Sequence, residues 1–179
     1  MKLQKYWRGS RKGNSIANEL TNTLLLIYLL VLFWILLLTL GVRFSYMGNN
    51  SVNLIPFDKS LDASETILNV VIFLPLGVYA EVLFKSRPLG TKLFFVFLFS
   101  LLIEGLQLIL RVGAFDITDI ITNTLGGIIG LIIFKVLKKL FHNSIRTQKF
   151  INIIAAIGTV LMVSLLLFLK LNMLPIKYQ

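Results

Sequence analysis

The chain has 179 residues, of which 56% are apolar and 15% charged, with a mean hydropathy of +0.84 and no cysteine. Soluble domains are about 45–50% apolar and about 25% charged, so this composition excludes a soluble two-domain enzyme and a disordered chain, and the lack of cysteine excludes a disulfide scaffold and thiol catalysis. On a soluble protein, the net charge of +10 would suggest binding to nucleic acid. On a membrane protein, basic loops instead set the orientation in the membrane and contact anionic lipids.

Five apolar segments are long enough to cross a bilayer, which takes about 20 helical residues. The first (20–42) and the last (150–169) contain no charge, while the three between them (67–84, 93–110 and 117–137) carry polar residues. A basic leader precedes the first segment, but the apolar run is too long for a signal peptide and no small-residue cleavage site follows it, so it is interpreted as a retained anchor. The predicted fold is all-α, a polytopic membrane bundle of about five transmembrane helices.

Basic residues alternate between the connections of this bundle. The N-terminus, the 85–92 turn and the 135–149 loop hold 13 Lys and Arg residues, against 5 in the other connections. The positive-inside rule therefore places the N-terminus in the cytoplasm and the C-terminus outside. The predicted organisation is a basic cytoplasmic N-terminus (1–19), a four-helix core with an outer loop at 43–66 (20–138), a basic cytoplasmic loop (139–149), and a fifth helix with a short outer tail (150–179).

Polar residues of the third segment share one helix face. Ser100, Glu104, Gln107 and Arg111 follow i, i+4, i+7, i+11 spacing, and Glu104 lies roughly 10 Å below Arg111. A carboxyl group at that depth needs an ionic partner or a proton, and an ionisable group within a membrane usually marks a functional site. Glu104 is therefore the candidate catalytic residue, with a buried polar clamp that specifies helix packing as the alternative.

The turn after the third segment is short, so the third and fourth segments should be antiparallel neighbours. Asp116 and Asp119 fall in the cap and first turn of the fourth helix, where the helix dipole favours anions. Asn123 lies one turn further on, at a depth similar to that of Glu104. We expect one outward-facing pocket between the second, third and fourth helices. Its predicted members are Glu104, Gln107, Arg111, Asp116, Asp119 and Asn123.

Other features of the middle segments predict packing. The G-x-x-x-G pattern at 126–130 predicts a close approach of a neighbouring helix, and Pro75 predicts a kink in the second segment. Glu81 with Lys85 four residues later predicts a surface ion pair. The apolar stretch at 53–58 is expected at the membrane interface or folded over the mouth of the bundle.

Several short motifs follow one another through the middle of the chain. They are Asn53-Leu54-Ile55-Pro56-Phe57, Asn69 with Phe73-Leu74-Pro75-Leu76-Gly77, Glu104-Gly105-Leu106-Gln107, and Arg111 with Asp116-Ile117-Thr118-Asp119, Asn123 and Gly126-Gly127. In this order they resemble the VanZ-like family over roughly residues 45–135, about half the chain, with the fifth helix beyond the resemblance. The resemblance adds Asn53 and Asn69 to the predicted pocket. It implies a multi-pass protein of the bacterial plasma membrane, associated with lowered susceptibility to glycopeptide antibiotics, teicoplanin especially.

Two functions stay open at this point. In the first, a non-enzymatic membrane protein reduces lipoglycopeptide access by binding the drug, a lipid or a lipid-linked cell-wall precursor in the pocket. The alternative is a membrane-embedded hydrolase or transferase acting on such an amphipathic outer-leaflet substrate. There Glu104 would be the general acid or base and Arg111 would hold an anion, while Asp116 and Asp119 would be candidates for a divalent cation.

A transporter is a weaker alternative, because no inverted repeat is visible. The expected partners are membrane lipids and not nucleic acid, since the basic loops are membrane-surface features. We expect no cofactor and no metal in the non-enzymatic function.

Overall fold

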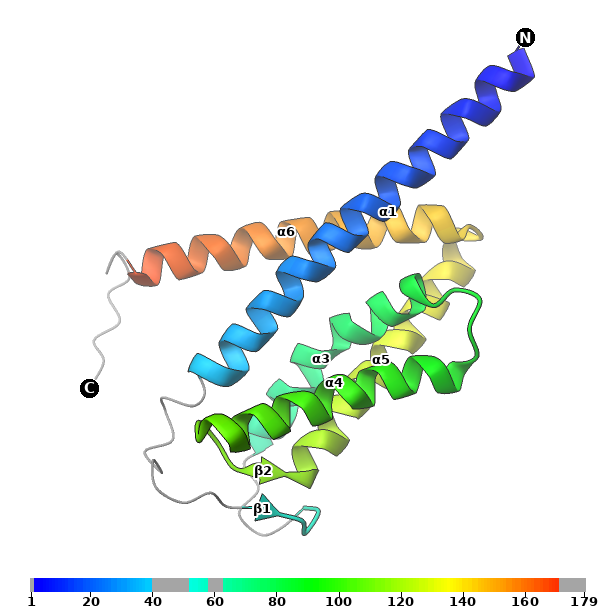
Figure 1. The fold of residues 1–179 in the computed structure, drawn as a ribbon. Helices are drawn as coiled ribbons and strands as arrows, with labels where there is room; N and C mark the ends of the chain where they lie inside the picture. Colours follow the sequence, from blue (N-terminus) through cyan, green and yellow to red (C-terminus); the bar gives the residue numbers. More distant parts are fainter. Residues whose placement is uncertain (1, 40–51, 58–62, 171–179) are drawn as a thin grey trace. The chain divides into compact units, whose positions relative to one another are not determined.

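The computed structural model describes residues 2–39, 52–57 and 63–170. Within them the chain is almost entirely helical, so the all-α fold is confirmed (Figure 1). The elements are α1 (Lys2–Trp34), the short π-helix η1 (Ile35–Thr39), β1 (Val52–Asn53), α3 (Ala63–Leu83), α4 (Leu89–Leu110), β2 (Phe115–Asp116), α5 (Ile117–Phe141) and α6 (Ser144–Lys170). Most of the predicted outer loop at 43–66 and the tail after residue 170 lie outside the described residues.

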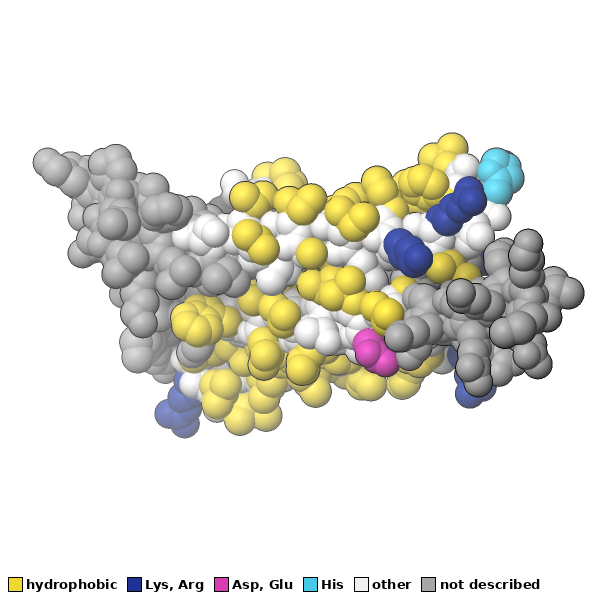
Figure 2. Space-filling model, turned by 90° about the horizontal axis from the view of Figure 1, so that it is seen from above, with side chains coloured by type: hydrophobic (Ala, Val, Ile, Leu, Met, Phe, Trp, Pro, Cys, Tyr) yellow, Lys and Arg dark blue, Asp and Glu magenta, His cyan; other side chains and the backbone are white. Residues whose placement is uncertain are grey.

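Four segments in the described part of the chain are long and apolar enough to cross a membrane. They are Ile16–Leu37, Ala63–Leu83, Leu89–Leu110 and Ile117–Phe141. They correspond to the first four predicted segments. The fifth predicted segment (150–169) is helical and lies within α6; most side chains near the end of α6 lie outside the described ones. Figure 2 shows hydrophobic side chains over the middle of one face and Lys and Arg side chains toward its ends, as expected for helices in lipid.

The chain forms two compact units, of which the first consists of Met1–Tyr28 and Asn143–Gln179. Here α6 is joined to α1 by buried polar side chains. Gln148 Nε2 donates to Thr21 Oγ1 over 2.8 Å, and Thr21 Oγ1 donates to Asn152 Oδ1 over 2.9 Å. Hydrogen bonds between helices satisfy groups that lipid cannot solvate, so these contacts explain why the fifth helix pairs with the first.

The second unit, Leu29–His142, is built around α3, α4 and α5, which run alongside one another (Figure 1). Glycines bring α3 and α5 together: a Cβ on Gly77 would overlap the Gly127 carbonyl, and one on Gly126 or Gly130 would collide with carbonyls of α3. The predicted close approach is confirmed. The side chains between these helices that are almost fully buried include Phe73, Leu76, Val96, Ile103, Leu131 and Phe134.

The second apolar segment forms α3, with Pro75 inside it and Glu81 near its end. The helix α3 is continuous through Pro75. The predicted surface pair of Glu81 is wrong, because Glu81 is buried and its ion-pair partner is Lys92 of α4, with Nζ and Oε2 2.7 Å apart. The turn between the helices folds α4 back along α3, which creates a tertiary partner that helix periodicity does not show. The side chain of Lys85 is largely exposed. The part of it that is buried and the nearby positive charge of Lys138 both lower the pKa of Lys85.

Candidate binding site

Asp116 connects three parts of the second unit. It is the N-cap of α5, with φ −121° and ψ 123°, and its Oδ1 accepts the Thr118 backbone N–H over 2.7 Å. Its Oδ2 accepts a hydrogen bond from Asn53 Nδ2 over 2.9 Å. Its own backbone N–H donates to Glu104 Oε2 over 3.3 Å. A single cap residue therefore ties the 52–57 segment and α4 to the start of α5, because both carboxylate oxygens and the backbone N–H of Asp116 are used.

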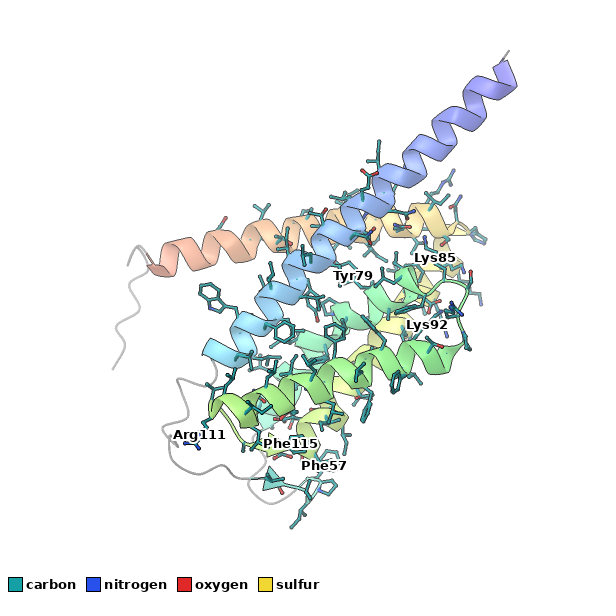
Figure 3. The ribbon with its side chains drawn as sticks, in the orientation of Figure 1. Phe57, Tyr79, Lys85, Lys92, Arg111 and Phe115 are labelled. Carbon is teal, nitrogen blue, oxygen red and sulfur yellow. The ribbon has the colours of Figure 1, made fainter. Side chains whose placement is uncertain are left out.

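The 52–57 segment lies against the start of α5. The strands β1 and β2 pair in parallel with Asn53 opposite Asp116, and the Phe57 N–H donates to Thr118 Oγ1 over 3.1 Å. Residues 54–57 remain exposed, so their apolar side chains, including Phe57 (Figure 3), are presented to the surroundings. The loop segment thus covers the beginning of α5 with its polar side and leaves its apolar side available to lipid.

A second set of contacts lies deeper between the helices. Asn69 of α3 is buried and donates from Nδ2 to Asp119 Oδ1 over 2.7 Å. One turn further along α5, Asn123 is 1% exposed and donates from Nδ2 to Ser100 Oγ over 3.0 Å. Ser100 lies one turn from Glu104 on α4. The Oδ1 atom of Asn123 is buried without a hydrogen-bond partner.

These contacts define what we call the acid–amide cluster. Its members, drawn from β1, α3, α4, β2 and α5, are Asn53, Asn69, Ser100, Glu104, Asp116, Asp119 and Asn123. Six of them were predicted as pocket residues. Ser100 was on the predicted polar face of the third helix but was left out of the predicted pocket, although its i, i+4 spacing from Glu104 was the signal that could have included it.

Gln107 and Arg111 point away from the acid–amide cluster. Gln107 Nε2 donates to the Leu36 carbonyl of η1 over 3.2 Å. Arg111 ends α4 in the left-handed conformation, with φ 56°, and its side chain is exposed (Figure 3). No ion pair or hydrogen bond joins Arg111 to the carboxylates in the described part of the chain, so their expected convergence stays a prediction.

In the described part of the chain, the cluster consists of several acids that have no cation paired with them. Glu104 is 2% exposed, and the acids whose charges act on it are Asp116, Asp119 and Glu65. Among the described residues, no Lys or Arg makes an ion pair or hydrogen bond with Glu104, Asp116 or Asp119. In the described part of the chain, no group of three or more His, Cys, Asp and Glu side chains is placed to hold a metal ion.

Comparison with known proteins assigns the family. The model of the VanZ/LLP1 family matches residues 25–141, well over half of the chain. This chain belongs to the VanZ/LLP1 family. It is also similar to Protein VanZ of Enterococcus faecium, with 37% identity over 152 residues that cover 83% of this chain and 92% of the relative. No solved structure matches.

The VanZ/LLP1 match coincides closely with the second compact unit, Leu29–His142. All seven members of the acid–amide cluster fall inside it, whereas α6 lies outside. Family membership and the four apolar helices together make this a membrane protein of the VanZ type. The fifth helix is thus an element beyond the family unit, held by its own polar contacts to α1.

Proposed function

We propose that this protein lowers susceptibility to lipoglycopeptide antibiotics such as teicoplanin, acting from the outer face of the bacterial plasma membrane. The acid–amide cluster is the part of the molecule that carries this function. The VanZ-like family is associated with this phenotype, and an acylated drug is amphipathic, so it reaches a membrane protein through the outer leaflet. The partners in this proposal are membrane lipids together with the drug or a lipid-linked cell-wall precursor.

The observation that carries the proposal is the convergence of separate motifs on one cluster. Asn53 bonds Asp116 across 63 residues of sequence, and Asn69 bonds Asp119 across 50. Glu104 joins them through the backbone of Asp116. Buried polar groups in a membrane protein are costly and usually functional, and here they come from the residues that define the resemblance.

The outer location is supported by the distribution of basic residues. The helix α4 begins beside Lys92 and ends next to the cluster, and its 22 residues correspond to about 33 Å, roughly the thickness of the hydrocarbon core. The basic 85–92 turn and the lysines near the end of α5 (Lys135, Lys138 and Lys139) lie at the Lys92 end, where the positive-inside rule places the cytoplasm. The cluster then faces outside, with the N-terminus in the cytoplasm and the C-terminus outside.

The first test is protection of a sensitive Gram-positive host. Expression of the wild-type chain should raise the inhibitory concentration of teicoplanin relative to an empty vector, with a smaller effect on a glycopeptide that lacks an acyl chain. The comparison separates a membrane-based mechanism from a general change in wall synthesis. Unchanged teicoplanin susceptibility at confirmed membrane expression would refute the proposed function.

The second test is the side of the membrane on which the cluster lies. Because the chain has no cysteine, single-cysteine variants can be labelled without background. Leu54→Cys, next to the cluster, should react with a membrane-impermeant maleimide in intact cells. Lys139→Cys, at the far end of α5, should react only after the cells are opened. The reverse pattern would place the cluster in the cytoplasm and overturn the outer location.

A second function is favoured by one observation, the burial of Glu104 with only one of its oxygens hydrogen-bonded. A buried carboxyl group with a free oxygen suits a general acid or base in a membrane-embedded hydrolase or transferase. This alternative requires turnover of a lipid, wall precursor or drug by the purified protein. Product formation that Glu104→Gln abolishes would establish it in place of binding.

A further inference from the structure

Each side-chain amide nitrogen of the acid–amide cluster already donates one hydrogen bond inside the protein. Asn53 and Asn69 donate to Asp116 and Asp119, and Asn123 donates to Ser100. The backbone N–H of Asp116 donates to Glu104. Each of these amide nitrogens therefore has one of its two N–H groups bound within the cluster, and the single backbone N–H of Asp116 is fully used.

The groups that remain are acceptors. The second carboxylate oxygens of Glu104 and Asp119 have no hydrogen-bond partner in the described part of the chain. The amide oxygen of Asn123 is buried and also lacks a partner. Asn123 follows Asp119 by one helical turn, and its bonded partner Ser100 precedes Glu104 by one turn. The three acceptors therefore come from adjoining turns of α4 and α5.

The positive charge that such a site needs is not supplied by the described residues. Arg111 is exposed at the end of α4, and Lys92 is paired with Glu81 at the opposite end of the helices. Carboxylates in a low-dielectric environment are stable only when they are paired. Two carboxyl groups and one amide oxygen with free acceptor capacity, and no cation among the described residues beside them, therefore favour a ligand that brings both a positive charge and N–H donors.

We propose that the acid–amide cluster binds the protonated amino group of an amphipathic ligand, through Glu104, Asp119 and the amide oxygen of Asn123. The inference rests on the proposed function, since it names the chemistry that the cluster recognises. An ammonium group has three donors and no acceptor, which matches three acceptors from two helices. A phosphate or a carboxylate is the wrong partner, because the acids of the cluster repel an anion and no cation among the described residues is paired with them to offset this.

The experiment uses the full chain in nanodiscs of zwitterionic lipid, with empty nanodiscs to subtract partitioning. The probes are dodecylamine, dodecyl phosphate and dodecyl glucoside, which share one chain and differ in the head group. Binding is measured by the shift of the thermal unfolding midpoint and by titration. Dodecylamine should bind and stabilise the wild-type protein, and the phosphate and the glucoside should not. Preference for the phosphate, or equal effects of all three, would overturn the inference.

The variants assign the binding to named atoms. Glu104→Gln and Asp119→Asn keep the shape but remove a charge, and each should weaken dodecylamine binding by about tenfold or more, the effect of losing one charge-assisted hydrogen bond. Asn123→Leu removes the free oxygen at similar volume and should also weaken binding. Glu19→Gln, an acid-to-amide change at an exposed position outside the cluster, is the matched control and should bind like wild type. Wild-type affinity in both acid variants would contradict the assignment.

The two proposals can fail separately. If the protein protects against teicoplanin but does not bind dodecylamine, the amine site is refuted and the proposed function is retained. If the protein binds dodecylamine through Glu104 but gives no protection, the proposed function is refuted and the amine site is retained. The susceptibility of the host and the head-group titration are measured on the same variants, so each result is interpretable alone.

Discussion

Replacing Lys92 by Met should lower the free energy of unfolding by about 3–5 kcal/mol, because the change leaves the Glu81 carboxylate buried without its partner. The Nζ and Oε2 atoms are 2.7 Å apart, and the two side chains are only 6% and 9% exposed. At an effective dielectric constant of about 20 the attraction between the charges is about 6 kcal/mol before desolvation is subtracted. Met keeps most of the length of Lys, so packing contributes little to the loss.

The assay is unfolding of the purified full chain in micelles by added sodium dodecyl sulfate, followed by circular dichroism. The double variant Glu81→Gln with Lys92→Met removes both charges and should recover most of the lost stability. Lys139→Met, which changes an exposed lysine at the end of α5, should unfold like wild type. A loss below about 1 kcal/mol for Lys92→Met, the range of surface pairs, would refute the buried ion pair.

Three further predictions use the same protein. Gly77→Ala should lower the free energy of unfolding by about 1–3 kcal/mol in that assay, because the new methyl group collides with the backbone of α5. The control Gly105→Ala, where the new methyl group meets open space, should be neutral or stabilising. Equal effects of the two substitutions would contradict the close packing of α3 on α5. Asn69→Ala should cost about 1–3 kcal/mol, since the half-buried carboxylate of Asp119 loses its donor; an unchanged midpoint would argue against that bond. Lys138→Gln should raise the pKa of Lys85 toward 10.5, as followed by NMR titration. Since the wild-type pKa is depressed on folding, stability should rise as pH increases from the folded-state value to 10.5, and this rise should shrink in the variant; an identical titration would disprove the coupling.

The apolar parts of the helices were predictable because each is a long apolar run bounded by charges or turn residues, whereas the start of α1 at Lys2, within the basic leader, lies outside such a run. The start of α5 followed from Asp116, whose side chain caps the helix as the sequence indicated. The glycines at 126–130 likewise predicted the contact with α3, since a small-residue stripe in a membrane helix has few other uses. These features depend on local sequence, which is why they could be inferred without coordinates.

Contacts that depend on the tertiary path of the chain could not be predicted from the sequence. Glu81 has a lysine at i+4, yet its partner is Lys92 across the helical hairpin. Arg111 shares the helical spacing of Glu104, but the helix ends on it in a left-handed conformation. The parallel pairing of Asn53 with Asp116 joins segments 63 residues apart. None of these follows from a periodic pattern, because each depends on where a turn redirects the backbone.

The measurement that tests the central claim most directly is teicoplanin susceptibility with wild-type protein, Glu104→Ala, Glu104→Gln and the control Glu19→Gln at matched membrane levels. If the acid–amide cluster carries the function, Glu104→Ala loses protection, Glu104→Gln retains part of it through its remaining hydrogen bonds, and Glu19→Gln protects like wild type. Full protection by Glu104→Ala would contradict the claim, because the most deeply buried acid of the cluster would then be dispensable.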